Sequence, residues 1–322
     1  MAITPEQLTR PNRQNNDPAN PNALIIPEFT GIVEQTIARK SVVEPWVPVR
    51  TVKGTNTVTN YAVGAPTLGK VSPGEAPPAT PGKFSKNSLI VDTMIYARNA
   101  LFFLETFQTA FDARQQIAQE HGKHIAKYKD QAFLIQAAKA AQLTASTFGP
   151  LDGHSGGSTY TLGAAADRTD PSKLYYALGK IAEALENKDV DPLADDVVIF
   201  LRPQEYYTLL NSEQLINSEL ITAAGNTVKT RVLSALGIPV ISTNNLPTGT
   251  VTGHLLGASY DGDFSKVVAV AFSPRALLAG ETIPVSSNLW FDNSSFTNYI
   301  DSYLSFGVTP NRPEYAAAIL TP

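Results

Sequence analysis

The chain has 322 residues, 43% of them hydrophobic, and its 25 Lys and Arg against 29 Asp and Glu give a formal net charge of −4. This length and apolar content exclude a disordered chain, and the lack of excess basic charge argues against direct binding of nucleic acid as the main task. Zero Cys excludes disulfides, thiolate nucleophiles and cysteine zinc sites, and only four His leave few groups for acid–base catalysis, which argues against an enzyme.

Residues 1–25 are rich in Pro and Asn and hold almost nothing that could fill a core. They predict an arm, either a disordered tail or a segment that becomes ordered only on a neighbouring subunit. A short helix that could anchor the arm is predicted within residues 26–40. We find neither an apolar run of about 18 residues nor a signal-peptide core, so the sequence predicts a soluble protein that is not exported by that route.

A breaker-rich segment follows the β-branched residues that predict strands between Ser41 and Val63. From Lys53 to Lys86 the chain holds five Gly, five Pro and four Lys, but only one acid. So many breakers between two strand signals cannot form a core of their own, so we expect a long hairpin-like projection. Its positive charge favours an acidic surface on another subunit, with a solvated loop as the alternative. The candidate intersubunit contact residues are Lys53, Lys70, Glu75, Lys83 and Lys86.

A long helix is predicted over Phe111–Gln142, after a strand over residues 87–98 and an apolar hinge over 100–107. At about 1.5 Å per residue it would span on the order of 48 Å, as the spine of a flat domain. Gly122 predicts a slight bend or a close backbone neighbour. The apolar stripe comprises Phe107, Phe111, Ala118, Ile125, Tyr128, Ala132 and Ile135. The charged residues expected off this stripe are Arg114, Glu120, Lys123, Lys127 and Lys139.

Residues 144–169 are rich in glycine, which predicts a mobile surface loop and a boundary between two domains. A compact α/β domain is expected after this loop, and the last forty or so residues are expected to rejoin the spine domain. Pro284 predicts an edge or a bend within an extended segment. The predicted helices are 171–187 and 204–210, and the predicted strands are 197–201, 238–242, 266–272, 275–291 and 315–320, with 211–230 as a polar loop and 298–306 of uncertain type.

This order of elements resembles the major capsid proteins of tailed double-stranded-DNA bacteriophages, the Hong-Kong-97-type capsid fold. Several stretches are similar to the short-tailed, T-seven-like (podovirus) branch. The resemblance covers residues 29–142 and 266–320 at residue level. The stretches are Ala38-Arg39-Lys40-Ser41-Val42 with Val49-Arg50, Pro73-Gly74-Glu75, Ile90-Val91-Asp92 with Ile95-Tyr96, and Arg312-Pro313-Glu314-Tyr315-Ala316-Ala317.

The resemblance implies an α+β fold with an N-terminal arm, an extended loop (the E-loop), a peripheral (P) domain built on the long helix, and an axial (A) α/β domain. The implied divisions are 1–40 for the arm and short helix, 41–98 for the E-loop hairpin and flanking strands, 99–150 for the P-domain spine helix, 151–280 for the A-domain, and 281–322 for return strands that complete the P-domain.

The resemblance also implies a function. Copies would assemble as pentamers and hexamers into an icosahedral shell that encloses double-stranded DNA without sequence-specific binding. Assembly would take place in the bacterial host cytoplasm, with a scaffolding protein, a portal protein at one vertex and, optionally, a cement protein, but no membrane. The alternatives are an encapsulin-like compartment shell of the same fold and, less favoured, an α/β enzyme. No covalent crosslinks are expected, because the crosslinking triad of the prototype cannot be aligned.

Three motifs invite a catalytic or metal-binding interpretation, but we assign no catalytic residue, cofactor or metal. Asp152–Gly157 resembles the nucleophile region of trypsin-like proteases, but His154 interrupts the pattern. His121 and His124 lie one helical turn apart without an evident third ligand, so a solvated or hydrogen-bonded pair is the simpler interpretation. Asp261–Asp263 is too short for a calcium loop.

Overall fold

The computed structural model describes residues 33, 35–36, 41–71, 74, 76, 79, 81–102, 113–211 and 233–322. The predicted arm, most of the predicted helix over 26–40, and the segments 103–112 and 212–232 lie outside the described residues. The chain divides into two compact units. The first unit comprises the described part of Met1–Ser41 with Asp92–Lys129 and Glu281–Phe306, and the second comprises Val42–Val91, Asp130–Gly280 and Gly307–Pro322.

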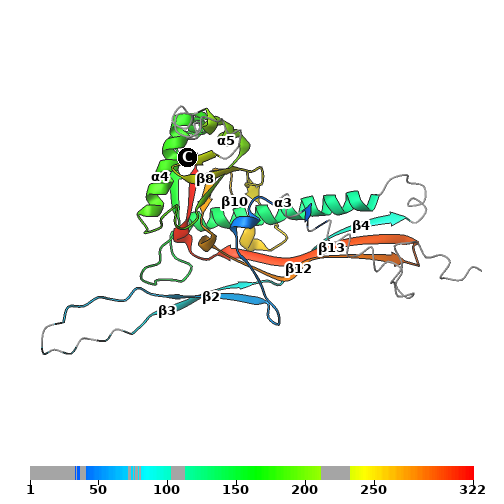
Figure 1. Ribbon diagram of the computed structural model, residues 1–322, viewed down its shortest axis with the longest axis horizontal. Coiled ribbons are helices and arrows are strands. Elements are labelled where there is room, and N and C mark those ends of the chain that lie inside the picture. The colour runs from blue at the N-terminus through cyan, green and yellow to red at the C-terminus, as the bar shows by residue number, and fades with distance from the viewer. Residues whose placement is uncertain are drawn as a thin grey trace, which may run out of the picture. The chain divides into compact units, whose positions relative to one another are not determined.

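The predicted long helix is confirmed as α3, Ala113–Gln142, with 30 residues (Figure 1). It contains no Pro and is rich in Ala, Gln and Lys, which lose little side-chain freedom in a helix. Of the predicted apolar stripe, Ala118, Ile125, Ala132 and Ile135 are buried and Tyr128 is half-buried, whereas the predicted polar positions Glu120, Lys123 and Lys127 are exposed. Phe107, Phe111 and the side chain of Arg114 lie outside what the structure describes.

In the first unit, one face of α3 covers strand β13, Thr297–Pro310. His121 Nδ1 lies 2.9 Å from Ser302 Oγ, and the ring of Tyr128 packs edge-on against Phe306 at a centroid distance of 6.3 Å. Ile125 lies on the same helix face, four residues after His121 and three before Tyr128. It is therefore buried on the side of the helix that faces this strand.

The prediction that Lys139 lies off the packed face is wrong. Near its C-terminal end α3 is covered almost all round, since nine of the ten residues from Ala132 to Ala141 are buried and only Lys139 is intermediate. The Lys139 Nζ donates to the carbonyl oxygens of Ser259 and Asp261, each at 2.6 Å. The small Ala side chains allow close packing, and the long Lys stem carries its charge past them to these acceptors.

Gly122 has the close backbone neighbour that the sequence predicts. A Cβ atom there would lie 2.6 Å from the Cβ of Thr36 and 3.0 Å from the carbonyl oxygen of Val33. Both residues belong to the short helical segment before residue 41. A glycine therefore lets this segment approach the backbone of α3.

A four-stranded sheet has the order β1-β12-β13-β4, and β13 pairs antiparallel with β4. The single strand predicted over residues 87–98 is wrong, because β3 ends at Ile90 and β4 begins at Ile95. Pro284 lies within β12. On one side of β12 the only neighbour among the described strands is β1, which has three residues, so most of that side is an edge of the described sheet, as expected for a strand that holds Pro. The bounds are β1 Val49–Thr51, β4 Ile95–Phe102 and β12 Leu277–Asp292.

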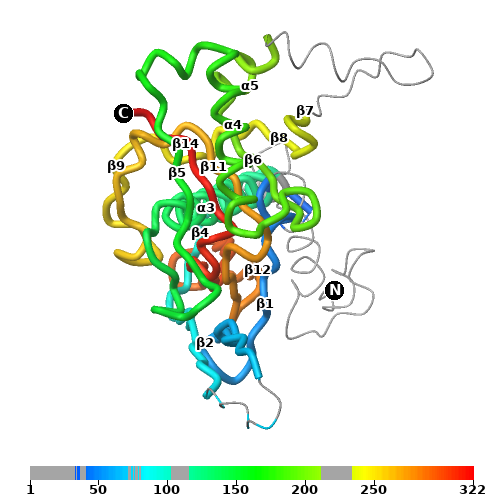
Figure 2. The backbone as a smooth tube through the Cα atoms, turned by 90° about the vertical axis from the view of Figure 1, so that its left-hand side faces the viewer, coloured from blue at the N-terminus to red at the C-terminus, as the bar shows by residue number. Residues whose placement is uncertain are grey.

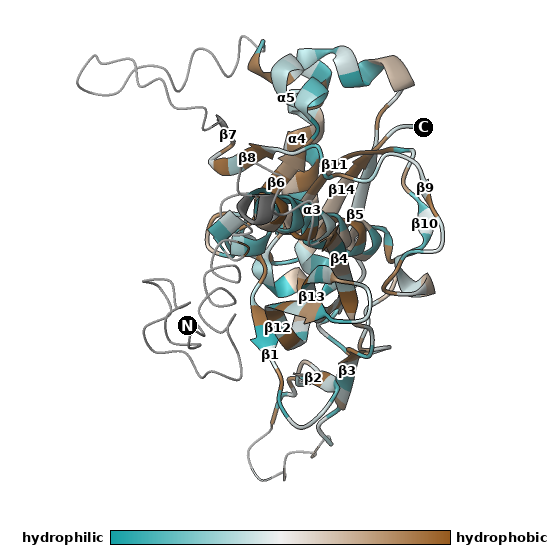
Figure 3. Ribbon diagram, turned by 90° about the vertical axis from the view of Figure 1, so that its right-hand side faces the viewer, coloured by the Kyte–Doolittle hydropathy of each residue, from teal (hydrophilic) through white to brown (hydrophobic). Residues whose placement is uncertain are grey.

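The second unit contains a six-stranded sheet of order β5-β14-β11-β6-β8-β7, and its central strands are strongly hydrophobic (Figure 3). The predicted strands β6 and β8 pair in parallel, as in an α/β domain. The predicted amphipathic helix is confirmed as α4, with its apolar face in the core. The bounds are β5 Ser158–Thr161, β6 Val198–Leu201, β7 Leu233–Ala235, β8 Ile238–Ser242, β11 Val267–Phe272, β14 Ala316–Leu320, α4 Pro171–Glu186 and α5 Pro203–Leu210. Shorter elements are η3 Glu44–Trp46, η4 Ala165–Thr169, β9 Thr250–Val251, η5 Ala258–Tyr260, β10 Gly262–Asp263, η6 Pro274–Ala276 and η7 Pro313–Tyr315.

The predicted loop over residues 144–169 is confirmed for residues 144–157, but residues 158–161 form β5 and residues 165–169 form η4. Its glycines include a close-packed pair, Gly156 and Gly157, at the C-terminal end of α3. The Gly157 N–H donates to the carbonyl oxygen of Leu143 at 2.7 Å, and Lys188 Nζ donates to both glycine carbonyls at 2.8 and 2.7 Å. The chain then enters strand β5, and these two glycines allow the close packing at the end of α3.

The last strand, β14, belongs to the six-stranded sheet. It pairs in parallel with β5 and antiparallel with β11, between which it lies (Figure 2). This corrects the expectation that all of residues 281–322 complete the P-domain. β14 is buried and apolar, which suits an interior position in a sheet. The other domain boundaries stay predictions.

Candidate intersubunit interface

The predicted projection begins as a two-stranded hairpin of β2, Thr57–Val63, and β3, Phe84–Ile90. The antiparallel register runs from Thr57 opposite Ile90 to Val63 opposite Phe84. Because side chains alternate along a strand, the hairpin has two distinct faces. We call the face with Val58, Asn60, Ala62, Ser85, Asn87 and Leu89 the inner face, and that with Thr57, Thr59, Tyr61, Val63, Phe84, Lys86, Ser88 and Ile90 the outer face.

The inner face packs against the rest of the second unit. Val58 and Leu89 form a buried cluster with Val91 and Leu278, and Ala62 packs with Phe148 and Leu151. Polar groups add two hydrogen bonds, since Asn60 Nδ2 donates to Asn311 Oδ1 at 2.9 Å and Asn87 Nδ2 donates to the Pro310 carbonyl at 2.7 Å. The stem of the hairpin is therefore fixed on its own subunit.

The outer face carries four exposed apolar side chains among polar ones. Tyr61 is 73% exposed and Phe84 76%, and Val63 and Ile90 are also exposed. Lys86 lies directly opposite Tyr61 in the register. Beyond the strands the chain continues away from the six-stranded sheet (Figure 1), and Leu68 there is 93% exposed. Exposed apolar side chains gathered on one face are typical of a protein–protein contact.

The structure places the predicted contact residues differently. Lys53, Lys70 and Lys86 are exposed, whereas Glu75 lies outside the described residues. Lys83 is exposed too, but its Nζ binds Asp152 of the same chain at 2.9 Å. This exposed ion pair contributes little to stability, yet it ties the base of the projection to the turn before β5. The exposed apolar residues of the outer face were not among the predicted contact residues.

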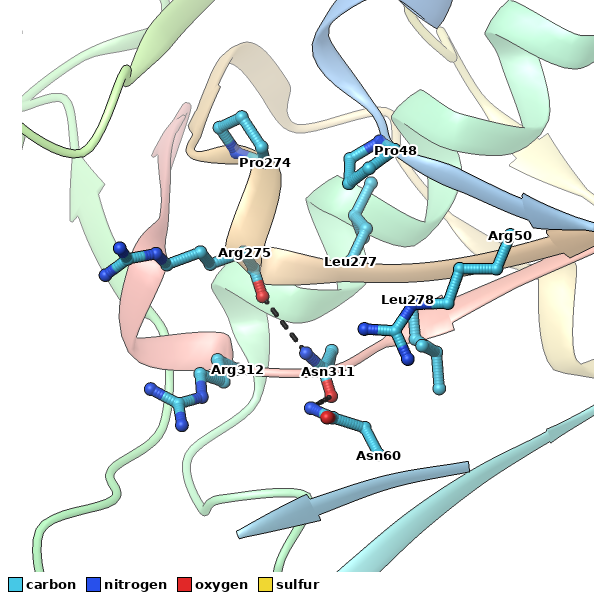
Figure 4. A pocket seen from close by; sticks show the side chains of 9 residues that line it. All are labelled: Pro48, Arg50, Asn60, Pro274, Arg275, Leu277, Leu278, Asn311 and Arg312. Atoms are coloured by element: carbon cyan, nitrogen blue, oxygen red, sulfur yellow. Dashed lines mark hydrogen bonds between the residues drawn. The ribbon is translucent and has the colours of Figure 1, made fainter. Parts of the chain in front are cut away.

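A pocket lined by three arginines lies beside the hairpin stem (Figure 4). It has a volume of about 370 Å³. Asn311 is buried at its centre, where Nδ2 donates to the Arg275 carbonyl at 3.2 Å while Oδ1 accepts from Asn60. Its residues are Pro48, Arg50, Asn60, Pro274, Arg275, Leu277, Leu278, Asn311 and Arg312. Sequence reasoning missed this site, although Arg50 and Arg312 stand in stretches that carry the capsid resemblance.

The side chains of the motifs Asp152–Gly157 and Asp261–Asp263 contact other groups of the same chain. His154 Nδ1 lies 3.2 Å from Glu314 Oε1, and its ring packs against Phe148, whereas the Ser155 hydroxyl contacts the Gly156 carbonyl. Asp261 accepts from the backbone N–H groups of Gly253 and His254 and therefore shapes a turn. Within the described residues, no group of three potential metal ligands occurs, and no helix is long and apolar enough to cross a membrane.

His121 and His124 do not act as a pair, because His121 is buried and His124 is exposed. The ring of His121 lies between Ser302 Oγ and Asn99 Oδ1, the latter 2.6 Å from Nε2. Burial, and to a lesser extent the nearby His124, lowers the pKa of His121 below its ordinary value of 6.5.

This shift predicts a pH dependence of stability. Because the folded His121 binds its proton less readily than the unfolded one, the free energy of unfolding should decrease as the pH falls below about 6.5. His121→Gln cannot titrate, so it should reduce that slope. Urea unfolding between pH 5 and pH 8 measures both slopes, and equal slopes in the two proteins would contradict the prediction.

Solved capsid structures share this architecture. The chain matches the capsid structure of the cyanophage P-SCSP1u with a TM-score of 0.75 and 18% sequence identity, over 88% of both chains. It matches the mature capsid of bacteriophage PhiM1 with a TM-score of 0.74 and 22% identity, over 87% of both chains. These similarities show the fold, and the predicted α+β Hong-Kong-97-type class is confirmed. No curated protein matches the chain.

Residues 86–319 match the family model described as phage capsid protein. This match covers more than half of the sequence. The chain belongs to the phage capsid protein family, and it is a capsid shell protein. Membership of a structural family agrees with the expectation of a non-enzymatic protein.

Proposed function

We propose that the chain is the major capsid protein of a tailed bacteriophage, whose copies assemble as pentamers and hexamers into an icosahedral shell around double-stranded DNA. The observation that carries this proposal is the outer face of the hairpin, where four exposed apolar side chains gather on a stem that its own subunit fixes in place. A neighbouring copy would cover this face. Many such contacts, each modest, add up in a closed shell.

The short-tailed branch and the accessory partners are also part of the proposal. The stretches quoted from the sequence support a T-seven-like relative. Such a shell would assemble in the bacterial cytoplasm with a scaffolding protein and a portal protein, and a cement protein could be added afterwards. Electron microscopy of particles that contain a short tail would support this branch, and a long contractile tail would contradict it.

Deleting Leu68–Gly82 should leave a folded subunit that no longer forms closed shells. The Gly64 N–H donates to the Lys83 carbonyl at 2.9 Å, so the remaining Ala65, Pro66 and Thr67 can close the shortened hairpin. The deletion removes intersubunit contact but no core residue. Circular dichroism checks folding and negative-stain microscopy checks assembly; normal shells from the deleted chain would contradict the proposal.

A matched pair of point variants tests the outer face itself. Phe84→Ser removes an exposed ring from this face, whereas Leu255→Ser removes an apolar side chain that is 65% exposed elsewhere in the second unit. Only Phe84→Ser is expected to reduce shell yield, because only that side chain is proposed to become buried between subunits. Equal shell yields from the two variants would mean that the outer face is not part of the interface.

An encapsulin-like compartment of the same fold is the second candidate. The fold alone does not separate it from a phage shell, since the chain also matches a virus-like particle from Pyrococcus furiosus with a TM-score of 0.55 and 12% identity, over 92% of this chain. The phage capsid family model and the higher TM-scores of the phage capsids favour the phage shell. Electron microscopy of purified particles separates the two, because a phage head encloses DNA and a compartment encloses cargo protein.

A further inference from the structure

The arginine pocket has more positive charge than the described residues around it balance. Arg275 Nη1 binds Asp195 Oδ1 at 2.9 Å, and its guanidinium lies over the ring of Tyr315. The side chains of Arg50 and Arg312 have no ion-pair partner among the residues that the structure describes. No acidic residue lines the pocket. Guanidinium groups favour carboxylate or phosphate partners, so the pocket is built for an anionic group.

The remaining lining favours a carboxylate on a peptide over a phosphate backbone. Two prolines and two leucines line the pocket beside the arginines, namely Pro48, Pro274, Leu277 and Leu278. Nucleic-acid backbone contacts are made mainly by cationic and polar groups and would leave this apolar surface uncovered. A peptide that carries one acid among small apolar residues would cover both kinds of surface.

We propose that the pocket binds the Glu75 carboxylate of a second copy of this chain. The proposal rests on the function proposed above. Glu75 is the single acid between Lys53 and Lys86, and it stands in the sequence Gly74-Glu75-Ala76-Pro77-Pro78, one acid among small apolar residues. It lies outside the described residues, so only its place in the sequence enters the argument.

The surroundings of the pocket suit the rest of that segment. Asp195 borders the pocket through its bond to Arg275, and the exposed Asp196 follows it, so acidic groups are available to Lys70, five residues before Glu75. In the view of Figure 4, Arg275 and Arg312 extend to one side of Asn311 and Arg50 lies on the other. A segment that crosses Asn311 would meet an arginine on each side.

The position of the pocket gives the contact a direction. Asn60 of the hairpin stem lines the pocket, so every subunit carries the receptor at the base of its hairpin and Glu75 within the projecting segment. Such a contact is heterologous, joining different surfaces of identical subunits, and it closes into a ring when the rotation between neighbours allows. Pentamers and hexamers are rings of this kind.

Charge reversal tests the proposal on the full-length chain. Glu75→Arg and Arg312→Glu should each lower the yield of closed shells about tenfold, because each places like charges together at the proposed contact. The double variant, Glu75→Arg with Arg312→Glu, should recover most of the yield. Arg50→Glu should behave like Arg312→Glu, and Glu186→Arg, at an exposed acid outside the projection, should assemble normally. Circular dichroism and thermal melting confirm that each variant is folded.

Several outcomes would overturn the inference. Normal shells from both Glu75→Arg and Arg312→Glu would show that this contact is not needed for assembly. If the deletion of Leu68–Gly82 still blocked assembly in that case, the proposed function would stand without this contact. Failure of the double variant to recover while all subunits are folded would mean that the pocket has another occupant. Normal empty shells from the arginine variants with a loss of packaged DNA would assign the pocket to nucleic acid.

Discussion

Replacing Ile125 by Asp is expected to leave the subunit insoluble or largely unfolded. Ile125 is 6% exposed and lies on the face of α3 that covers β13. Losing a buried apolar side chain of this size costs roughly 2 to 5 kcal/mol, against the roughly 5 to 15 kcal/mol of a typical domain. The unpaired carboxylate adds a further cost. His121, one turn away, offers no compensating charge at neutral pH, because burial lowers its pKa.

Lys127→Asp is the matched control, because it places the same side chain two residues further along α3 at an exposed position. This variant should fold and at most assemble differently, since exposed substitutions usually change stability by about 0.5 kcal/mol or less. Circular dichroism and thermal melting compare the two proteins. Equal stability of both would mean that the packed face of α3 is assigned wrongly.

Gly157→Ala is expected to have the second large effect, although it adds a single methyl group. The new Cβ atom would clash with the carbonyl oxygen of Ala140 and lie 2.5 Å from the carbonyl oxygen of Ala141. Both obstacles are backbone atoms at the end of α3, which cannot turn aside as a side chain can. Overpacking of this kind typically costs about 1 to 3 kcal/mol, and we expect the upper part of that range. The midpoint of thermal unfolding should fall by several degrees.

Gly69→Ala provides the comparison for this variant, because a Cβ atom at Gly69 would meet nothing within 4 Å. Its melting midpoint should equal or slightly exceed that of the parent, since alanine restricts the unfolded chain more than glycine does. If Gly157→Ala and Gly69→Ala had the same midpoint of thermal unfolding, the approach of Gly157 to α3 would be looser than the structure shows.

Regular elements were predictable where a strong local pattern agrees with the tertiary packing. α4 follows the 3.6-residue period of its apolar residues, and α3 follows from a long run of helix-favouring residues without Pro. β6 and β11 are short apolar runs that become interior strands. Gly122 could be predicted to have a close neighbour, because an interior glycine weakens a helix unless packing requires it. Each of these predictions needs only the local sequence, although the neighbour that Gly122 accommodates lies far away in the chain.

The missed features depend on partners that are distant in sequence. Gly156 and Gly157 look like loop residues in the sequence, and only the position of the end of α3 shows why they are small. Asn60 and Asn311, which join in the arginine pocket, are 251 positions apart. Lys139 looked like a solvated residue because its acceptors at Ser259 and Asp261 lie far along the chain. No local pattern carries such information.

The place of β14 between β5 and β11 has a consequence for the order of events during synthesis. β14 pairs Ala317 with Ser158, so the edge of β5 stays open while more than a hundred later residues are translated. The sheet closes only after residues 316–320 have left the ribosome. Open strand edges are templates for wrong pairing, and long-range pairing is slow. We therefore expect nascent chains to be most prone to aggregate, and most dependent on chaperones, in the interval before β14 docks.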